Sequence, residues 1–209
     1  IQFFQFSLHN KVIQNTMLEN YKVILASTSP RRRELLKGLE LNFECASPLT
    51  DDESYPDTLL GGEIPMYIAS KKADSMLPKM DDNTIVIAAD TIVWFDGKVY
   101  GKPKDRAEAI QMLKDFSGNT HAVFTGCCLR TKEKSHPFYA VSYVTFARLK
   151  DEEIEYYVDH YKPFDKAGAY GVQEWIGYIG VVSIEGSFYN IMGLPLQRLY
   201  TEINKFVGK

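Results

Sequence analysis

The chain has 209 residues, of which 45% are hydrophobic and 24% charged, and its formal net charge is −3. This composition is typical of one globular core, or of two small lobes that share a cleft, and it excludes a disordered or fibrous protein. Proteins that bind polymeric nucleic acid usually carry a basic excess, so 24 basic against 27 acidic residues argue against that partner. A small anionic ligand held by a few local cations is compatible with the charge.

No apolar run approaches the ~20 residues that span a bilayer, so the sequence predicts no membrane partner. The three cysteines, Cys45, Cys127 and Cys128, show no CxxC spacing, so neither a zinc ribbon nor a disulfide framework is indicated. Cys127 and Cys128 lie in an apolar stretch, and we expect them to pack as small hydrophobic residues. A reduced, cytoplasmic setting fits this pattern.

The first residues do not resemble a signal peptide, because residues 1–16 lack a basic start followed by a long apolar stretch. Met17 stands just before the first convincing strand pattern and is a candidate for the natural start. The sequence therefore predicts an N-terminal extension over residues 1–20, either non-native or disordered, and one folded domain over residues 21–209.

Short apolar runs alternate with helical patterns in the rest of the chain, which predicts an α/β protein. In the first half, the expected elements are a strand over 22–26, a helix over 30–39, a helix from Pro65 at its first position to about Leu77, and a strand over 84–89 that ends at Asp90. In the second half they are a helix from Asp105 to Phe116, a strand pair over 121–130 and 138–149, a helix from Asp151 to Tyr161, a strand over 178–184 and a helix over 195–206. We expect a sheet that mixes parallel and antiparallel pairs.

Three arginines stand where a helix should disfavour them. In the run Ser29-Pro30-Arg31-Arg32-Arg33, the serine is a good N-cap and the proline a good first helical residue. The arginines then lie in the first turn, where the partial positive charge of the helix N-terminus disfavours each cation by roughly 0.3–1 kcal/mol. Free N–H groups, serine hydroxyls and guanidinium groups together can bind a phosphate. Taken alone, the same residues fit a solvated basic helix start equally well. The position directly after a buried strand favours the phosphate site.

An ordered series of motifs resembles the Maf family. It begins with a Ser-x-Ser-Pro-Arg-Arg-x-Glu-Leu-Leu signature, from Ser27 to Leu36. The further matches are Asp52-Glu53-Ser54, Ile68 to Ala73, Ala89 to Val93, Gly101-Lys102-Pro103, Phe116-Ser117-Gly118 with His121 and Thr125-Gly126, Asp165 to Gln173, Gly186 to Asn190, and Gly193 to Leu196. One such motif is a weak signal, but the ordered series, which covers nearly all of the chain from Tyr21 on, is highly specific.

The resemblance implies a fold and an activity. The fold is an elongated α/β structure with a central mixed sheet flanked by helices, and with two lobes around a deep cleft, similar to the inosine triphosphatase fold. The activity is hydrolysis of a nucleoside triphosphate between its α and β phosphates, to monophosphate and pyrophosphate, with a divalent metal cation such as Mg²⁺ or Mn²⁺. Removal of non-standard nucleotides is one expected purpose. Separately from the resemblance, we expect a homodimer.

Two carboxylates are the candidates for metal binding and proton transfer. Asp90 matches the family's general base, which takes a proton from the attacking water while the metal polarises the phosphate. Glu53 matches the family's glutamate, and with Asp90 it can offer oxygen ligands to a hard cation. Without the resemblance, Asp90 would more often be a strand-end aspartate and Glu53 part of a solvated acidic run; a slip of one residue to Asp52 is the alternative for Glu53.

Several cations and hydroxyl groups are the candidates for holding the triphosphate. The catalytic lysines implied by the resemblance are Lys72 and Lys102, and the phosphate-binding residues are Ser27, Ser29, Arg31 and Arg32, with Lys166 as a weaker candidate. Family spacing selects Lys72, and we expect its neighbour Lys71 to be solvated. Cleavage of a phosphoanhydride depends mostly on positioning and on neutralising charge, which explains the number of cations.

Three positions are matched to base choice in this family: Arg31, Thr91 and Gln173. Their combination resembles the type that prefers dTTP and UTP over the type that prefers 7-methyl-GTP, and a glutamine amide can donate and accept along a pyrimidine edge. Bulky Glu174-Trp175 follows where a small residue is common, which predicts a reshaped base pocket.

Two alternatives stay open at this point. One is the same chemistry on modified pyrimidine or purine triphosphates. The other is a nucleotide-binding regulator of division or septation that has no useful turnover. Retention of Glu53, Asp90, Lys72 and Lys102 argues against the regulator, since a pure binder needs no carboxylates placed for a metal.

Overall fold

The computed structural model describes residues 18–208. Most of the expected N-terminal extension, residues 1–17, lies outside the described residues. No helix in the described part of the chain is both long and apolar enough to cross a membrane.

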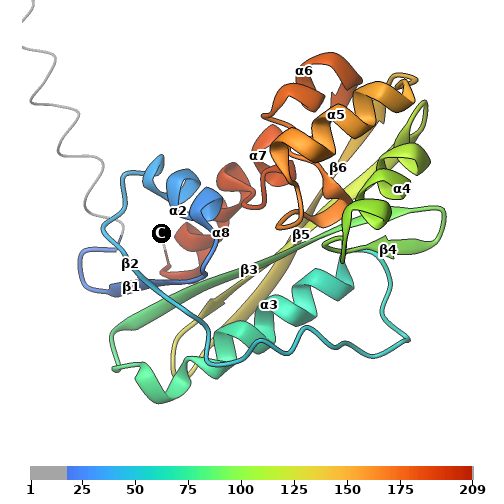
Figure 1. Cartoon of the computed structure of the whole chain (residues 1–209). Coiled ribbons are helices and arrows are strands. Elements are labelled where there is room, and N and C mark those ends of the chain that lie inside the picture. The colour runs from blue at the N-terminus through green and yellow to red at the C-terminus, as the bar shows by residue number, and fades with distance from the viewer. Residues whose placement is uncertain (1–17, 209) are drawn as a thin grey trace, which may run out of the picture.

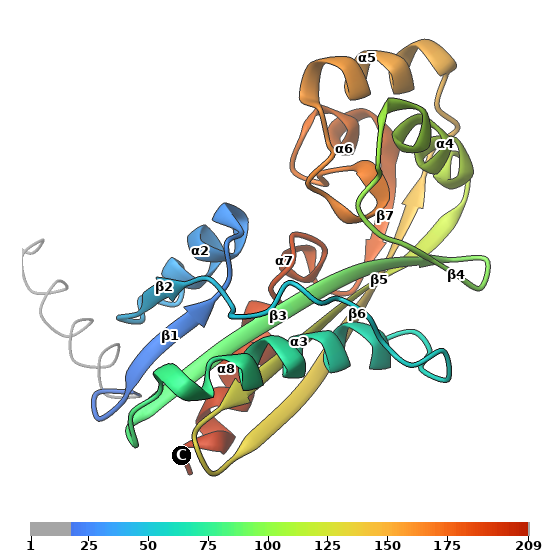
Figure 2. The ribbon, with the colours of Figure 1, turned by 60° about the horizontal axis from the view of Figure 1, so that its bottom comes forward.

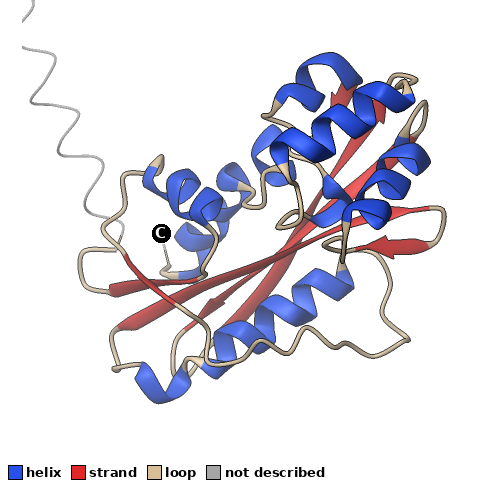
Figure 3. Cartoon of the chain, in the orientation of Figure 1, coloured by secondary structure: helices blue, strands red, loops and turns tan. Residues whose placement is uncertain are grey.

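A seven-stranded mixed sheet forms the centre of the protein (Figures 1 and 3). Its strands are β1 (Lys22–Ala26), β2 (Glu44–Ala46), β3 (Thr84–Phe95), β4 (Lys98–Tyr100), β5 (Thr120–Arg130), β6 (Ser135–Phe146) and β7 (Val181–Glu185). The order is β2-β1-β3-β5-β6-β7, and β4 pairs with β3. The β2-β1-β3 pairs are parallel and all others antiparallel, which confirms the predicted mixture.

Helices cover both faces of the sheet. They are α2 (Pro30–Lys37), α3 (Glu63–Ser75), α4 (Arg106–Phe116), α5 (Asp151–Tyr161), α6 (Trp175–Gly180), α7 (Phe188–Ile191) and α8 (Leu196–Phe206), with short 3-10 turns η1 (Leu77–Lys79) and η2 (Ala167–Ala169). Figure 2 shows α3 along one face of the long strands, α2 and α8 near one end, and α4, α5 and α6 grouped at the other end. The helices and the sheet thus form two lobes joined by β3, β5 and β6.

Alternating side chains of β3 supply both faces of the first lobe, as strand geometry requires. Ile85 and Ile87 pack in one buried cluster with Leu36 of α2 and Leu199 of α8. Val86 and Ala88 pack in another, with Ala69 and Ala73 of α3. The second lobe has its own core, in which Phe116 of α4, Tyr157 of α5 and Ile176 of α6 pack together. Cys127 and Cys128 are fully buried in the first lobe, as predicted.

Several expected boundaries were wrong. β6 spans Ser135–Phe146 rather than 138–149, and α2 ends at Lys37 rather than at residue 39. β3 does not end near residue 90 but continues to Phe95, because β5 pairs with it as far as Trp94. α3 begins at Glu63, so Pro65 is its third residue; a proline is tolerated there because first-turn N–H groups have no partner within the helix. The apolar run 178–184 divides between α6 and β7, an ambiguity that is common for short apolar runs.

Gly126 lets α3 lie directly on the sheet. An added Cβ at this position of β5 would lie 2.1 Å from the backbone nitrogen of Met66 and 2.2 Å from the carbonyl carbon of Pro65. Gly126→Ala is therefore expected to lower the free energy of unfolding by about 3 kcal/mol, since backbone cannot move aside as a side chain can. Urea denaturation followed by circular dichroism measures the change.

The matched control is Gly101→Ala, because an added Cβ at Gly101 would have nothing within 4 Å. Its free energy of unfolding is expected within about 0.5 kcal/mol of the wild-type value. Equal unfolding midpoints for Gly126→Ala and Gly101→Ala would contradict the close approach of α3.

Candidate active site

A cavity of about 1030 Å³ opens where β1 ends, between the two lobes. β1 pairs with β3 as far as Ala88, and β4 pairs with β3 from Val93 on. On that edge of β3, residues 89–92 therefore lie between the two partner strands and form the floor of the cavity. All the residues predicted for the site line this one cavity: Ser27, Ser29, Arg31, Arg32, Glu53, Lys72, Asp90, Thr91, Lys102, Lys166 and Gln173.

The start of α2 is built as the sequence predicts. The Ser29 hydroxyl caps the helix by accepting from the Arg32 amide at 3.4 Å, and the Ser27 hydroxyl accepts from the Ser29 amide at 3.1 Å. Arg31 and Arg32 line the cavity, whereas Arg33 is exposed outside it. Two of the three arginines therefore accompany the helix N-terminus at the cavity.

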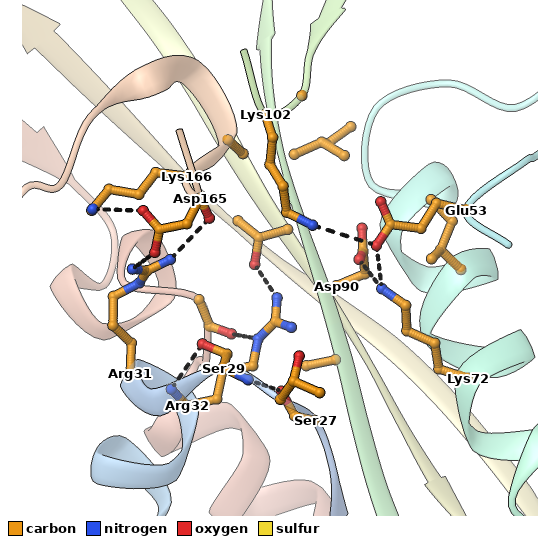
Figure 4. Close-up of a pocket in the computed structure, with 18 of the residues that line it drawn as sticks. Ser27, Ser29, Arg31, Arg32, Glu53, Lys72, Asp90, Lys102, Asp165 and Lys166 are labelled. Atoms are coloured by element: carbon orange, nitrogen blue, oxygen red, sulfur yellow. Dashed lines mark hydrogen bonds and ion pairs between the residues drawn. The ribbon is translucent and has the colours of Figure 1, made fainter. Parts of the chain in front are cut away.

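Arg32 is held by a chain of hydrogen bonds that runs into the sheet. Its Nε donates to the Gly193 carbonyl at 2.8 Å and its Nη2 to the Thr91 hydroxyl at 3.0 Å (Figure 4). Thr125 donates to the Asn190 carbonyl at 2.9 Å, so its own oxygen must accept from Thr91 across 3.0 Å. This direction leaves a Thr91 lone pair for Arg32. The role of Thr125 was missed in the sequence, although the residue belongs to a matched motif.

Asp90 and Glu53 share one ammonium group. Lys72 Nζ lies 2.6 Å from Asp90 Oδ1 and 2.8 Å from Glu53 Oε1 (Figure 4). Asp90 points from β3 toward α3, which carries Lys72, and both side chains are buried. Lys102, beyond β4, is more distant, at 3.8 Å from Glu53 Oε1, and its side chain is 59% exposed. Because β3 runs from Thr84 to Phe95, Asp90 lies in the middle of a buried strand and not at a strand end.

Burial raises the pKa of the Asp90 carboxyl above its usual range, and the charges of Lys72 and Arg32 oppose that rise. For Glu53, burial acts in the same direction, but the hydrogen bond and charge of Lys72, with the charges of Lys102 and Arg32, give a net lowered pKa. The two carboxyl groups are therefore unlike. A carboxylate with a raised pKa is the better proton acceptor, and that group is Asp90.

The acid pair fits a hard divalent cation. No group of three or more histidine, cysteine, aspartate or glutamate side chains in residues 18–208 could hold a metal ion. Mg²⁺ does not need such a cage, because it usually binds through one or two carboxylates, several waters and substrate phosphates. Two carboxylate oxygens already converge on the Lys72 ammonium, which shows that their geometry suits a shared cation.

On the opposite side of the cavity, Asp165 is bonded to two of the predicted phosphate-binding cations. Its Oδ2 accepts from Arg31 Nη1 at 2.7 Å, and its Oδ1 accepts from Lys166 Nζ at 2.8 Å. Lys166 also lies 3.2 Å from Glu174 Oε1. Asp165 was not among the predicted site residues; its place beside Lys166 in a matched motif was the available signal. A ligand phosphate that binds Arg31 or Lys166 therefore competes with Asp165 for that cation.

Glu174 and Trp175 were predicted to reshape the base pocket, but neither lines the cavity. The Glu174 carboxylate accepts a hydrogen bond from the Tyr157 hydroxyl, and Trp175 packs edge-on against Tyr156. Gln173 does line the cavity, and Glu174 reaches the site only through its contact with Lys166, while Trp175 lies away from it.

The expected solvation of Lys71 is also wrong. Its side chain is 24% exposed and its Nζ lies 2.5 Å from Asp52 Oδ2. The one-residue alternative for Glu53 is resolved by the same contact: Asp52 bonds to Lys71, while Glu53 lines the cavity.

This fold and this cavity define an α/β protein with a cleft for a polyanion, in which arginines at a helix start face an acid pair. The chain belongs to the family of Maf-like proteins, whose family model matches residues 22–206. The "dTTP/UTP pyrophosphatase" of Bacteroides thetaiotaomicron is 57% identical over 188 residues, which are 90% of this chain and 97% of that protein. The protein of the same name from Parabacteroides distasonis is 57% identical over 91% of this chain and 100% of its own length. The solved structure of a HAM1 protein from Coxiella burnetii aligns with 88% of this chain and 99% of that chain, at 18% identity and a TM-score of 0.44.

Proposed function

We propose that this protein is a nucleoside triphosphate pyrophosphatase that hydrolyses dTTP and UTP to the monophosphate and pyrophosphate. The observation that carries the proposal is the Lys72 ammonium, shared by Asp90 and Glu53, across one cavity from the arginines of α2. The names of the relatives at 57% identity support the same activity.

The chain's own residues divide the work between binding and proton transfer. Ser27, Ser29 and Arg32 hold phosphate oxygens at the start of α2, where the helix N-terminus favours an anion. Lys72 and Lys102 neutralise charge that develops on the phosphate oxygens. Asp90 accepts the proton of the attacking water.

A Mg²⁺ or Mn²⁺ ion held by Glu53 and Asp90 would supply a Lewis acid that neutralises phosphate charge and lowers the pKa of water. Arg31, Thr91 and Gln173 determine the choice of base. Thr91 acts through Arg32, because its hydroxyl is already bonded to that guanidinium group and to Thr125.

The setting that we propose is cytoplasmic, and the assembly homodimeric. All three cysteines, Cys45, Cys127 and Cys128, are free thiols, which suits a reduced compartment.

The test is a panel of UTP, dTTP, CTP, ITP and 7-methyl-GTP, each with Mg²⁺ and with Mn²⁺. We expect UTP and dTTP to be turned over at least about tenfold faster than the others, because one or two base contacts give discrimination of this order. The products to be measured are monophosphate and pyrophosphate. Release of orthophosphate instead of pyrophosphate, or no hydrolysis of any of the five triphosphates, would refute the proposal. Faster turnover of ITP or 7-methyl-GTP than of UTP and dTTP would refute the proposed substrates.

A further inference from the structure

Lys71 fastens the loop that carries Glu53. Its Nζ lies 2.5 Å from Asp52 Oδ2, 2.9 Å from the Ser54 carbonyl and 3.2 Å from the Ser54 hydroxyl. An ammonium group has three donors, and these three acceptors use all of them. The acceptors belong to the two residues on either side of Glu53. Lys71 therefore binds the two residues that flank Glu53, and the next lysine of α3, Lys72, binds Glu53 itself.

Further hydrogen bonds give the loop a defined shape once Lys71 holds it. The Ser54 amide donates to Asp52 Oδ1 at 2.9 Å, and the Asp52 amide donates to the Thr50 hydroxyl at 3.2 Å. Upstream, the Leu49 amide donates to the Ser75 hydroxyl at the end of α3. The segment is nevertheless exposed from Asp51 to Ser54, so it has little buried apolar area to keep it in place.

The two lysines differ in what a ligand does to them. Lys72 contacts Glu53 and Asp90, so a phosphate or a divalent cation at the acid pair competes for the very contacts that tie Lys72 to the loop. The acceptors of Lys71 lie outside the cavity lining, and a ligand leaves them in place. Lys71 can therefore keep Glu53 near the site while Lys72 is drawn to a substrate phosphate.

We propose that Lys71 is a positioning residue, which holds the Asp52–Ser54 loop so that Glu53 stays at the active site during turnover. Lys71 touches neither the cavity nor the acid pair, so it acts only through the loop. The inference rests on the proposed pyrophosphatase function for its effect on rate, but the holding of the loop can be measured without turnover.

The experiment compares wild-type protein with Lys71→Met, Lys71→Arg and Lys114→Met. Lys114 is the matched control, because it too is a helix lysine paired with an acid of another element, Asp151 at 3.0 Å. Two quantities are measured: the exchange rate of the Ser54 amide by nuclear magnetic resonance, and kcat and KM for UTP. Lys71→Met is expected to speed Ser54 exchange and to lower kcat, each by roughly tenfold, with KM unchanged because the groups at α2 are untouched.

Lys71→Arg is expected to restore both quantities, since a guanidinium group can bond the same acceptors, and Lys114→Met is expected to alter neither. Asp52→Asn should also speed Ser54 exchange and lower kcat, as Lys71→Met does. This second variant allows the proposal to be tested even if Lys71→Met folds poorly. Wild-type exchange at Ser54 in both Lys71→Met and Asp52→Asn would overturn the proposal, as would a lowered kcat with unchanged exchange. If wild-type protein hydrolyses no triphosphate, the proposed function fails, and the exchange rates still decide whether Lys71 holds the loop.

Discussion

Asp90→Asn is expected to lower the turnover of dTTP and UTP by about 10⁴-fold, because it removes the proposed proton acceptor and replaces a charged ligand of the proposed metal by a neutral amide. The asparagine has nearly the same size, so the packing of β3 against α3 should be retained. Arg32 and the serines at α2 do not depend on Asp90 for their contacts, so the nucleotide should still bind. Pyrophosphate release measures the rate, and isothermal titration calorimetry measures the binding.

The matched control is Asp115→Asn, which changes an aspartate of α4 that bonds to the Tyr100 hydroxyl outside the cavity. Its turnover should equal that of the wild-type protein. If Asp90→Asn hydrolysed UTP within tenfold of the wild-type rate, Asp90 could not be the proton acceptor. If nucleotide binding and turnover were lost together, the residue would be needed for binding rather than for chemistry.

Local patterns predicted most of the elements. The strand over residues 22–26 and the helix from Asp151 to Tyr161 have the predicted bounds, because burial and capping are both written in the local sequence. The extension of β3 to Phe95 was not predictable in this way. It depends on pairing with β5, which comes some thirty residues later in the chain, and a single strand does not show how far its partner extends.

The site was predictable for residues that match a motif of the series, and unpredictable for contacts of residues to which the series assigns no role. The motif series brought Asp90, Glu53 and Lys72 together before any geometry was known. The pair Arg31–Asp165 joins residues 134 positions apart, and its formation depends on how the two lobes face each other. The bond from Lys71 to Asp52 spans only 19 positions, but adjacent lysines on a helix cannot be told apart without knowing which face carries the loop.

The length of β3 also explains how one strand contributes both to the acid pair with Lys72 and to the arginine site at α2. Successive residues of a strand point to opposite faces, so Asp90 faces α3 and Thr91 faces α2. Because β1 ends beside Ala88, both side chains reach the same cavity around the open edge. A strand that ended at residue 90 would have left Thr91 in a turn, without the fixed bond to Thr125 that orients Arg32.

Lys72→Met is expected to lower kcat/KM by about 10³-fold, because it removes a preorganised cation from the place where phosphate charge develops in the proposed mechanism. It also leaves Asp90 buried without its ammonium partner, which is expected to lower the free energy of unfolding at neutral pH by about 3–5 kcal/mol. Lys102→Met removes the same charge from a side chain that is 59% exposed and 3.8 Å from Glu53. Its free energy of unfolding should stay within about 0.5 kcal/mol of wild type.

The effect of Lys72→Met on stability should depend on pH in a direction that follows from Asp90. Burial raises the pKa of Asp90 and the charge of Lys72 opposes the rise, so loss of Lys72 raises that pKa further. A carboxyl group with a raised pKa in the folded state binds its proton more tightly there, so stability falls as pH rises from the unfolded pKa through the folded one. The stability deficit of Lys72→Met should therefore be small near the pKa of an aspartate in the unfolded chain, about 4, and grow as pH rises toward neutrality, and the acidic limb of its kcat/KM profile should move to higher pH. Urea denaturation across this range measures the first effect, and a deficit that did not change with pH would show that Lys72 contributes packing rather than charge.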